Sequence, residues 1–119
     1  EIAMYQYAMQ LMKGEFVEQD QKKAANYLKM SADIGYSQSM DVYGLLLLKG
    51  CGVAKDINEA IKYFKMAINK GNADSMYHFA KILYNDAELP NNKKVAAQYF
   101  KMAADNEYLF ANVEKWRWY

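Results

Sequence analysis

A step of 36 residues recurs through this sequence and limits its fold more than any other feature. The segments NYLKMSADIG, KYFKMAINKG and QYFKMAADNE align without insertion or deletion, so that Tyr27, Tyr63 and Tyr99 share one position. The segments before them, AMYQYAMQLMKG, SMDVYGLLLLKG and SMYHFAKILYND, follow the same step. Self-similarity at a period of this length is typical of a tandem repeat protein, in which each unit contacts only its neighbours.

The period predicts a single repeat domain over 1–119. We expect repeats at 1–36, 37–72 and 73–108, followed by a remainder at 109–119 that is a partial repeat or a C-terminal capping helix. The sequence begins at Glu1 with neither an initiator methionine nor a leader pattern, so we expect it to be a segment of a longer protein.

Each repeat contains two helical patterns. Their apolar residues recur at the spacing i, i+3, i+4 and i+7, which marks one face of a helix. In the middle repeat these residues are Met40, Tyr43, Gly44 and Leu47 in the first pattern, and Ala60, Tyr63, Phe64 and Ala67 in the second. A small residue holds the shared positions 8, 44 and 80, where it allows a neighbouring helix to approach closely.

Helix-capping residues follow the same period. Asp56, with Glu59 three residues later, predicts an N-cap and a capping box for the second helix of the middle repeat. The equivalent positions in the other repeats hold Asp20 and Asn92. With only one proline and six glycines in 119 residues, these patterns predict an all-α fold.

Composition excludes several classes of function. The net charge is +1 and the lysines are interleaved with acids, so no concentrated basic patch for nucleic acid is expected. The longest apolar run, 42–48, is far shorter than the ~20 residues that a membrane span requires. A single cysteine rules out an internal disulfide framework and favours a reducing compartment such as the cytoplasm, with any targeting signal outside this segment.

The stretch KGCGVAKD (49–56) looks at first like a site of chemistry. It lacks both the G-x-G-x-x-G fingerprint of dinucleotide binding and the G-x-x-x-x-G-K-[ST] pattern of a P-loop. It aligns instead with KGEFVEQD and NDAELPNN, which join the two helical patterns of the other repeats. We therefore interpret it as a loop between helices, and Cys51 as an incidental loop cysteine.

The period, the paired helices and the connector G-x-G-V-x-x-D-x-x-x-A, carried by residues 43–71, resemble the Sel1-like repeat family. This family is similar to tetratricopeptide repeats, with a longer loop between the helices. The resemblance covers residues 1–108. Phe16 and Glu88 depart from it at the second glycine of the connector, and Glu107 departs from it at the terminal glycine.

The resemblance implies a right-handed, superhelical α/α solenoid whose first helices line a concave surface. It also implies an adaptor or scaffold that binds a protein or peptide, without catalysis and without a cofactor. A cysteine-rich branch of the family has been linked to penicillin binding and β-lactam hydrolysis, and its repeats each contain a cysteine pair. Because this chain has only Cys51, we do not carry that activity over.

If the first helices line a groove, the residues that point into it vary between repeats beside a constant framework, as a recognition surface requires. The candidates are rich in aromatic residues and methionine, which supply contact area, and include a few charges that fix orientation. Packing between repeats is the alternative role for the aliphatic ones. The candidate residues are Tyr5, Met9, Met12, Asp41, Leu45, Leu48, Asp74, Tyr77, His78, Lys81 and Tyr84.

His78 is the only histidine, and no acidic or cysteine pattern around it predicts a metal site, so we expect it at the rim of the groove. No paired carboxylates are arranged for acid–base chemistry. The C-terminal LFANVEKWRWY begins a further first-helix pattern, but Trp116 replaces its small residue. We expect a cap there. One alternative is a truncation scar. The other is a homodimer contact through Trp116, Trp118 and Tyr119, which would make the chain a self-associating structural segment.

Overall fold

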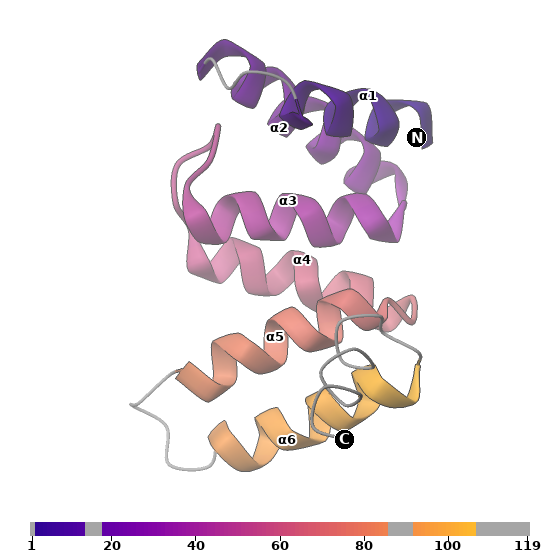
Figure 1. The fold of residues 1–119 in the computed structure, drawn as a ribbon, viewed down its shortest axis with the longest axis vertical. Coiled ribbons are helices and arrows are strands. Elements are labelled where there is room, and N and C mark those ends of the chain that lie inside the picture. The colour runs from indigo at the N-terminus through magenta and orange to yellow at the C-terminus, as the bar shows by residue number, and fades with distance from the viewer. Residues whose placement is uncertain (1, 14–17, 86–91, 107–119) are drawn as a thin grey trace. The chain divides into compact units, whose positions relative to one another are not determined.

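The computed structural model describes residues 2–13, 18–85 and 92–106 (Figure 1). Over these ranges the chain forms helices and no strands. The helices are α1 (Ile2–Lys13), α2 (Glu18–Ile34), α3 (Ser37–Lys49), α4 (Ile57–Asn69), α5 (Ala73–Asn85) and α6 (Asn92–Asp105). Each repeat therefore contributes one pair of helices, and the prediction of an all-α repeat fold is confirmed.

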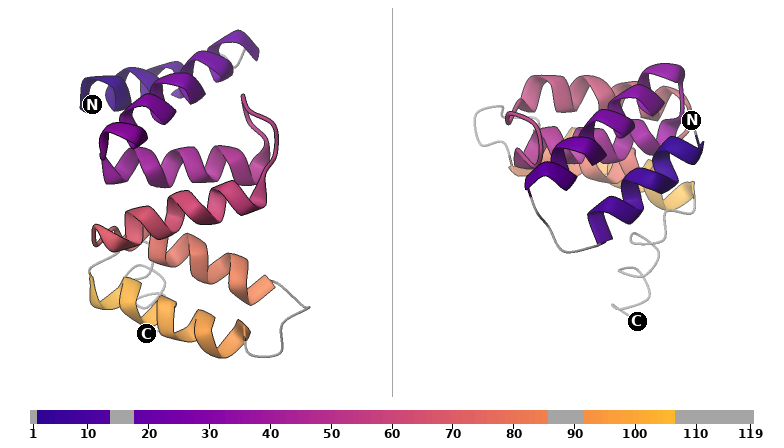
Figure 2. Two further views of the ribbon diagram at one scale, coloured as in Figure 1. Left: turned by 180° about the vertical axis from the view of Figure 1, so that it is seen from behind. Right: turned by 90° about the horizontal axis from the view of Figure 1, so that it is seen from above.

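The chain divides into two units, 1–70 and 71–119. In the first unit α2 packs against both α1 and α3, and α3 packs against α4 (Figure 2). In the second unit α5 packs against α6. Within this first unit, α2 of the first repeat thus packs on α3 of the second repeat.

Small residues let the two helices of a repeat approach closely. The position shared by Ala24, Ala60 and Ala96 is fully buried in all three repeats. Gly44 on α3 faces the ring of Phe64 on α4, and a Cβ atom at Gly44 would lie 2.8 Å from Cε1 of that ring. The predicted framework residues of α3 and α4 are buried, which confirms the periodicity argument for the middle repeat.

An edge-to-face aromatic pair joins the two helices of every repeat. The ring centroids lie 4.9–5.0 Å apart, at a spacing that favours such T-shaped contacts. The pairs are Tyr7 with Tyr27, Tyr43 with Tyr63, and Phe79 with Tyr99. The same aromatic contact therefore recurs once in each 36-residue repeat.

Polar contacts join the first repeat to the second. Ser39 Oγ on α3 donates to Ser31 Oγ on α2 across 2.6 Å, and both residues are fully buried. Tyr63 Oη on α4 donates to Asp33 Oδ1 on α2 across 3.0 Å. The other carboxylate oxygen of Asp33 lies 3.0 Å from Lys29 Nζ, one turn back on the same helix.

Tyr63 and Tyr43 are affected by these surroundings. Burial, followed by the hydrogen bond to Asp33, raises the pKa of Tyr63 strongly. Burial also raises the pKa of Tyr43, against a lowering contribution from the charge of Lys29. The hydrogen bond to Asp33 raises the pKa of Lys29. We interpret this cluster as part of the contact between two repeats, because the hydrogen bond from Tyr63 to Asp33 joins α4 to α2.

In the middle repeat the predicted N-cap forms but the reciprocal half of the capping box does not, and in the first repeat the helix begins earlier than predicted. Asp56 accepts a hydrogen bond from the Glu59 N–H across 3.1 Å, as predicted. In a capping box the Glu59 side chain would accept a hydrogen bond from the N–H of Asp56. Here that N–H donates to the carbonyl of Leu47 instead, at 2.9 Å. α2 begins at Glu18, two residues before the expected cap at Asp20, because Glu18 and Gln19 are themselves good helix formers.

Candidate functional site

Five of the predicted partner-binding residues fall on α5. They are Asp74, Tyr77, His78, Lys81 and Tyr84, here called the α5 strip. Steps of three and four residues place them along one side of a helix. Asp74 and Lys81 are exposed, Tyr84 is 52% exposed, and Tyr77 and His78 are half-buried. The strip therefore offers two charges and a large aromatic surface to solvent.

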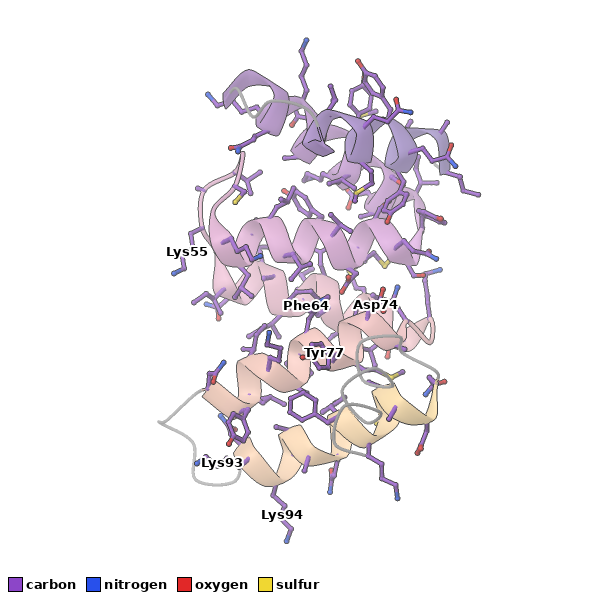
Figure 3. The ribbon with its side chains drawn as sticks, in the orientation of Figure 1. Lys55, Phe64, Asp74, Tyr77, Lys93 and Lys94 are labelled. Atoms are coloured by element: carbon purple, nitrogen blue, oxygen red, sulfur yellow. The ribbon has the colours of Figure 1, made fainter. Side chains whose placement is uncertain are left out.

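Contacts with α6 and within α5 orient the strip. The ring of Tyr77 lies 5.5 Å from that of Phe100, and Lys81 Nζ lies 5.5 Å from the Tyr77 centroid. Lys93 Nζ lies 5.4 Å from the centroid of Tyr84, so both tyrosine rings of the strip carry a cation beside them. Lys94 extends away from the helix pair (Figure 3).

The candidates of the first repeat are less accessible. Tyr5 and Met9 are half-buried on α1, and the Tyr5 ring meets that of Tyr36 edge-on at 5.4 Å. The side chain of Met12 lies outside the described residues, as do Trp116, Trp118 and Tyr119 with the rest of the predicted cap. The cap and the aromatic homodimer contact therefore remain predictions.

The candidates of the middle repeat are mostly enclosed. Leu45 and Leu48 are half-buried on α3, while Asp41 is only 4% exposed. Among the described residues every buried side-chain oxygen and nitrogen has a hydrogen-bond partner, so the Asp41 carboxylate is already engaged. Its position was expected to carry a surface charge, and the structure places that charge inside.

The loop that contains Cys51 packs against the start of α2. Gly52 has a φ of 73°, and a Cβ atom there would overlap the carbonyl oxygen of Gln21. This contact explains the second glycine of KGCGVAKD, since only glycine fits both the backbone angle and the space. The loop borders a hollow of about 340 Å³, lined by Gln21, Lys22, Gly50, Gly52, Val53 and Ala54.

The described lining of the hollow includes one charged side chain, that of Lys22, and no cysteine, histidine or acidic residue. Cys51 is half-buried and lies beside the hollow, outside its lining. Across residues 2–13, 18–85 and 92–106, no cluster of three histidine, cysteine or acidic side chains is arranged to hold a metal ion. In the same part of the chain, no helix is long and apolar enough to cross a membrane.

The paired helices, their 36-residue register and the small-residue contacts define an all-α helical repeat protein of the solenoid class. The model of the Sel1 repeat matches residues 2–36, 37–72 and 73–108, so the chain belongs to the Sel1 repeat family. Proteins of this family are generally non-catalytic scaffolds that bind other proteins. The resemblance inferred from the sequence is thereby confirmed.

Solved structures share this fold. A Sel1 repeat protein from Oxalobacter formigenes is 26% identical, with a TM-score of 0.81 over 92% of this chain and 45% of its own. A protective antigen of uropathogenic Escherichia coli strains, which displays an SLR fold, is 24% identical with a TM-score of 0.79, over 92% of this chain and 24% of its own. The chain thus spans less than half the length of these relatives. No curated protein matches it.

Proposed function

We propose that this chain is a protein-interaction module that binds a peptide or protein segment along the first helices of its repeats, with the α5 strip as the main contact. The observation that carries the proposal is the exposure of Lys81 and Tyr84 beside the half-buried ring of Tyr77. Large aromatic side chains next to a charge are typical of residues that dominate binding energy at interfaces. Membership of a family that generally binds proteins supports the same function.

The chemistry of the strip favours a partner with an apolar anchor followed by an acidic group. The anchor would lie on Tyr84, and a carboxylate would pair with Lys81 or Lys93, which already lie beside tyrosine rings. Asp74, at the other end of α5, would repel an acidic group placed there and so fix the direction of the bound segment. Tyr5 and Met9 on α1 and Leu45 and Leu48 on α3 are the remaining contacts in this proposal.

Affinity capture from a cell extract tests the proposal. The chain is compared with a Lys81→Glu, Tyr84→Ala double variant, and circular dichroism verifies that both are folded. The control is Lys94→Glu with Met102→Ala, which makes the same charge change and removes an apolar side chain from exposed positions of α6. We expect a protein that is retained by the chain and the control and lost by the first variant. Equal retention by all three would contradict the assignment.

A further inference from the structure

Two lysines, one on α5 and one on α6, lie against different tyrosine rings of the α5 strip. Lys81 Nζ lies 5.5 Å from the centroid of Tyr77, and Lys93 Nζ lies 5.4 Å from that of Tyr84. The two tyrosines are seven residues apart on α5, which corresponds to about 10 Å along the helix axis. Lys93 lies near one end of the helix pair, and Tyr77 lies nearer its middle (Figure 3). The strip therefore has two cationic positions.

Both lysines are accessible to a partner. Lys81 and Lys93 are exposed, and the contacts with the rings orient their ammonium groups. Orientation before binding reduces the entropy that is lost when a partner pairs with them. The residue equivalent to Lys93 in the middle repeat, Ile57, is 44% exposed, so exposure at this position is not peculiar to the last repeat.

Charge is distributed unevenly along α5 and α6. Over 73–85 and 92–106 the acidic residues are Asp74, near the start of α5, and Asp105, at the end of α6. Because the two helices run antiparallel, these acids lie at the same end of the pair (Figure 1). Lys93 and Lys94 lie at the opposite end, where α6 begins. An acidic segment is therefore attracted to the lysine end and repelled from the other.

We infer that the segment bound by the α5 strip carries two acidic side chains, one paired with Lys81 and the other with Lys93, and an apolar side chain that lies on Tyr84. This inference rests on the proposed function and narrows its partner to an acidic peptide segment. The uneven charge argues against a nucleic acid strand, because Asp74 lies on the same strip and the net charge of the chain is only +1.

Fluorescence anisotropy of labelled, designed peptides tests the inference. The probes consist of glycine, serine and alanine with one leucine and two glutamates. The glutamates are separated by about three residues, which span about 10 Å in an extended chain. Matched probes replace one or both glutamates with glutamine. At about 50 mM salt, where screening is weak, each replacement should lower the affinity about twofold to fivefold.

Variants of the chain assign each acidic group to its lysine. Lys81→Gln and Lys93→Gln should each weaken binding of the two-glutamate peptide about twofold to fivefold. Each variant should have no effect once the glutamate that pairs with its lysine is replaced by glutamine. The control is Lys94→Gln, at an exposed neighbouring position whose side chain extends away from the helix pair, and it should leave the affinity unchanged (Figure 3).

Several results would overturn the inference. They are an equal effect of Lys93→Gln and Lys94→Gln, equal binding of the peptides with one and two glutamates, and no binding of any peptide. Displacement of the peptide by a thymidine oligonucleotide would also overturn it, since the strip would then bind nucleic acid.

The capture experiment separates a failure of this inference from a failure of the proposed function. If Lys81→Glu, Tyr84→Ala loses the captured protein while Lys93→Gln retains it and binds the peptides normally, the inference fails and the proposed function stands. Equal capture by all the variants would overturn both.

Discussion

Gly44 offers a test of how the helices of a repeat pack. In an isolated helix, alanine is more favourable than glycine by about 1 kcal/mol, so propensity alone predicts that Gly44→Ala stabilises the protein. The structure predicts the opposite. A Cβ atom at Gly44 would lie 2.8 Å from Cε1 and 3.0 Å from Cζ of Phe64, and the Phe64 side chain is fully buried.

The magnitude follows from these two opposing effects. Overpacking of a closely packed core costs about 1–3 kcal/mol, because a buried ring has no free space into which it can move. After subtracting the gain in propensity, we expect Gly44→Ala to lower the free energy of unfolding by up to about 2 kcal/mol. For a chain of this size, each 1 kcal/mol of lost stability corresponds to a fall in Tm of roughly 3–6 °C.

The first repeat supplies the compensating change. Its residues equivalent to Gly44 and Phe64 are Ala8 and Leu28, and both are fully buried. Phe64→Leu alone leaves a void and should cost about 1–2 kcal/mol. The double variant with Gly44→Ala and Phe64→Leu would recreate the alanine–leucine pair that the first repeat already uses, so most of the stability should return.

Urea denaturation followed by far-ultraviolet circular dichroism measures the free energy of unfolding of the unchanged chain, the two single variants and the double variant. We expect a favourable coupling of at least about 1 kcal/mol between the two changes. The m-values should stay constant, which would show that stability changes and the extent of unfolding does not. Stabilisation by Gly44→Ala, or simple additivity of the two changes, would refute the packing argument.

Three further predictions concern other contacts. The raised pKa of Tyr63 contributes stability that is present below about pH 10 and is lost as pH rises above it, at about 1.4 kcal/mol per pH unit. Tyr63→Phe should therefore make the fall in the free energy of unfolding between about pH 10 and 11.5 shallower. Urea titrations at each pH measure this fall. An unchanged slope would contradict this linkage. Gly52→Ala should cost at least about 2 kcal/mol in the same assay, because its Cβ atom would overlap the carbonyl of Gln21 and the backbone φ is positive. A cost below about 0.5 kcal/mol would show that the loop moves freely. Asp56→Ala should cost about 1 kcal/mol and Asp56→Asn much less, and equal losses would argue against the cap.

The fold could be predicted from sequence because it depends on local periodicity. The spacing of Tyr43, Gly44, Tyr63 and Phe64 marked the apolar faces of two helices, and the structure buries all four. Asp56 was identifiable as a cap from its position before a helical pattern. Asn72, whose side chain accepts from the Ser75 N–H, caps α5 in the same way and was missed, although an asparagine before a helical pattern was a usable signal.

Exposure at the candidate site could not be predicted in the same way. Tyr7 follows the same pattern as Tyr43 but is exposed, because burial at that position depends on a helix of another repeat. Asp41 was expected to line a groove, yet it lies inside, where its side chain has an interaction partner within the protein in place of water. The contact of Tyr63 with Asp33 could not be predicted, because the shared tyrosine position does not by itself indicate which residue of another repeat it meets.

The buried hydroxyl pair of Ser31 and Ser39 has a consequence for how such a gene can change. Tandem repeats gain units by in-register recombination, which inserts an extra copy of an existing repeat. A second copy of the first repeat, inserted directly after the original, would set Ser31 against Ala3 in place of Ser39, and loss of that hydrogen bond costs on the order of 1 kcal/mol. One pair of hydroxyl groups thus penalises that duplication and helps to preserve the order of the repeats.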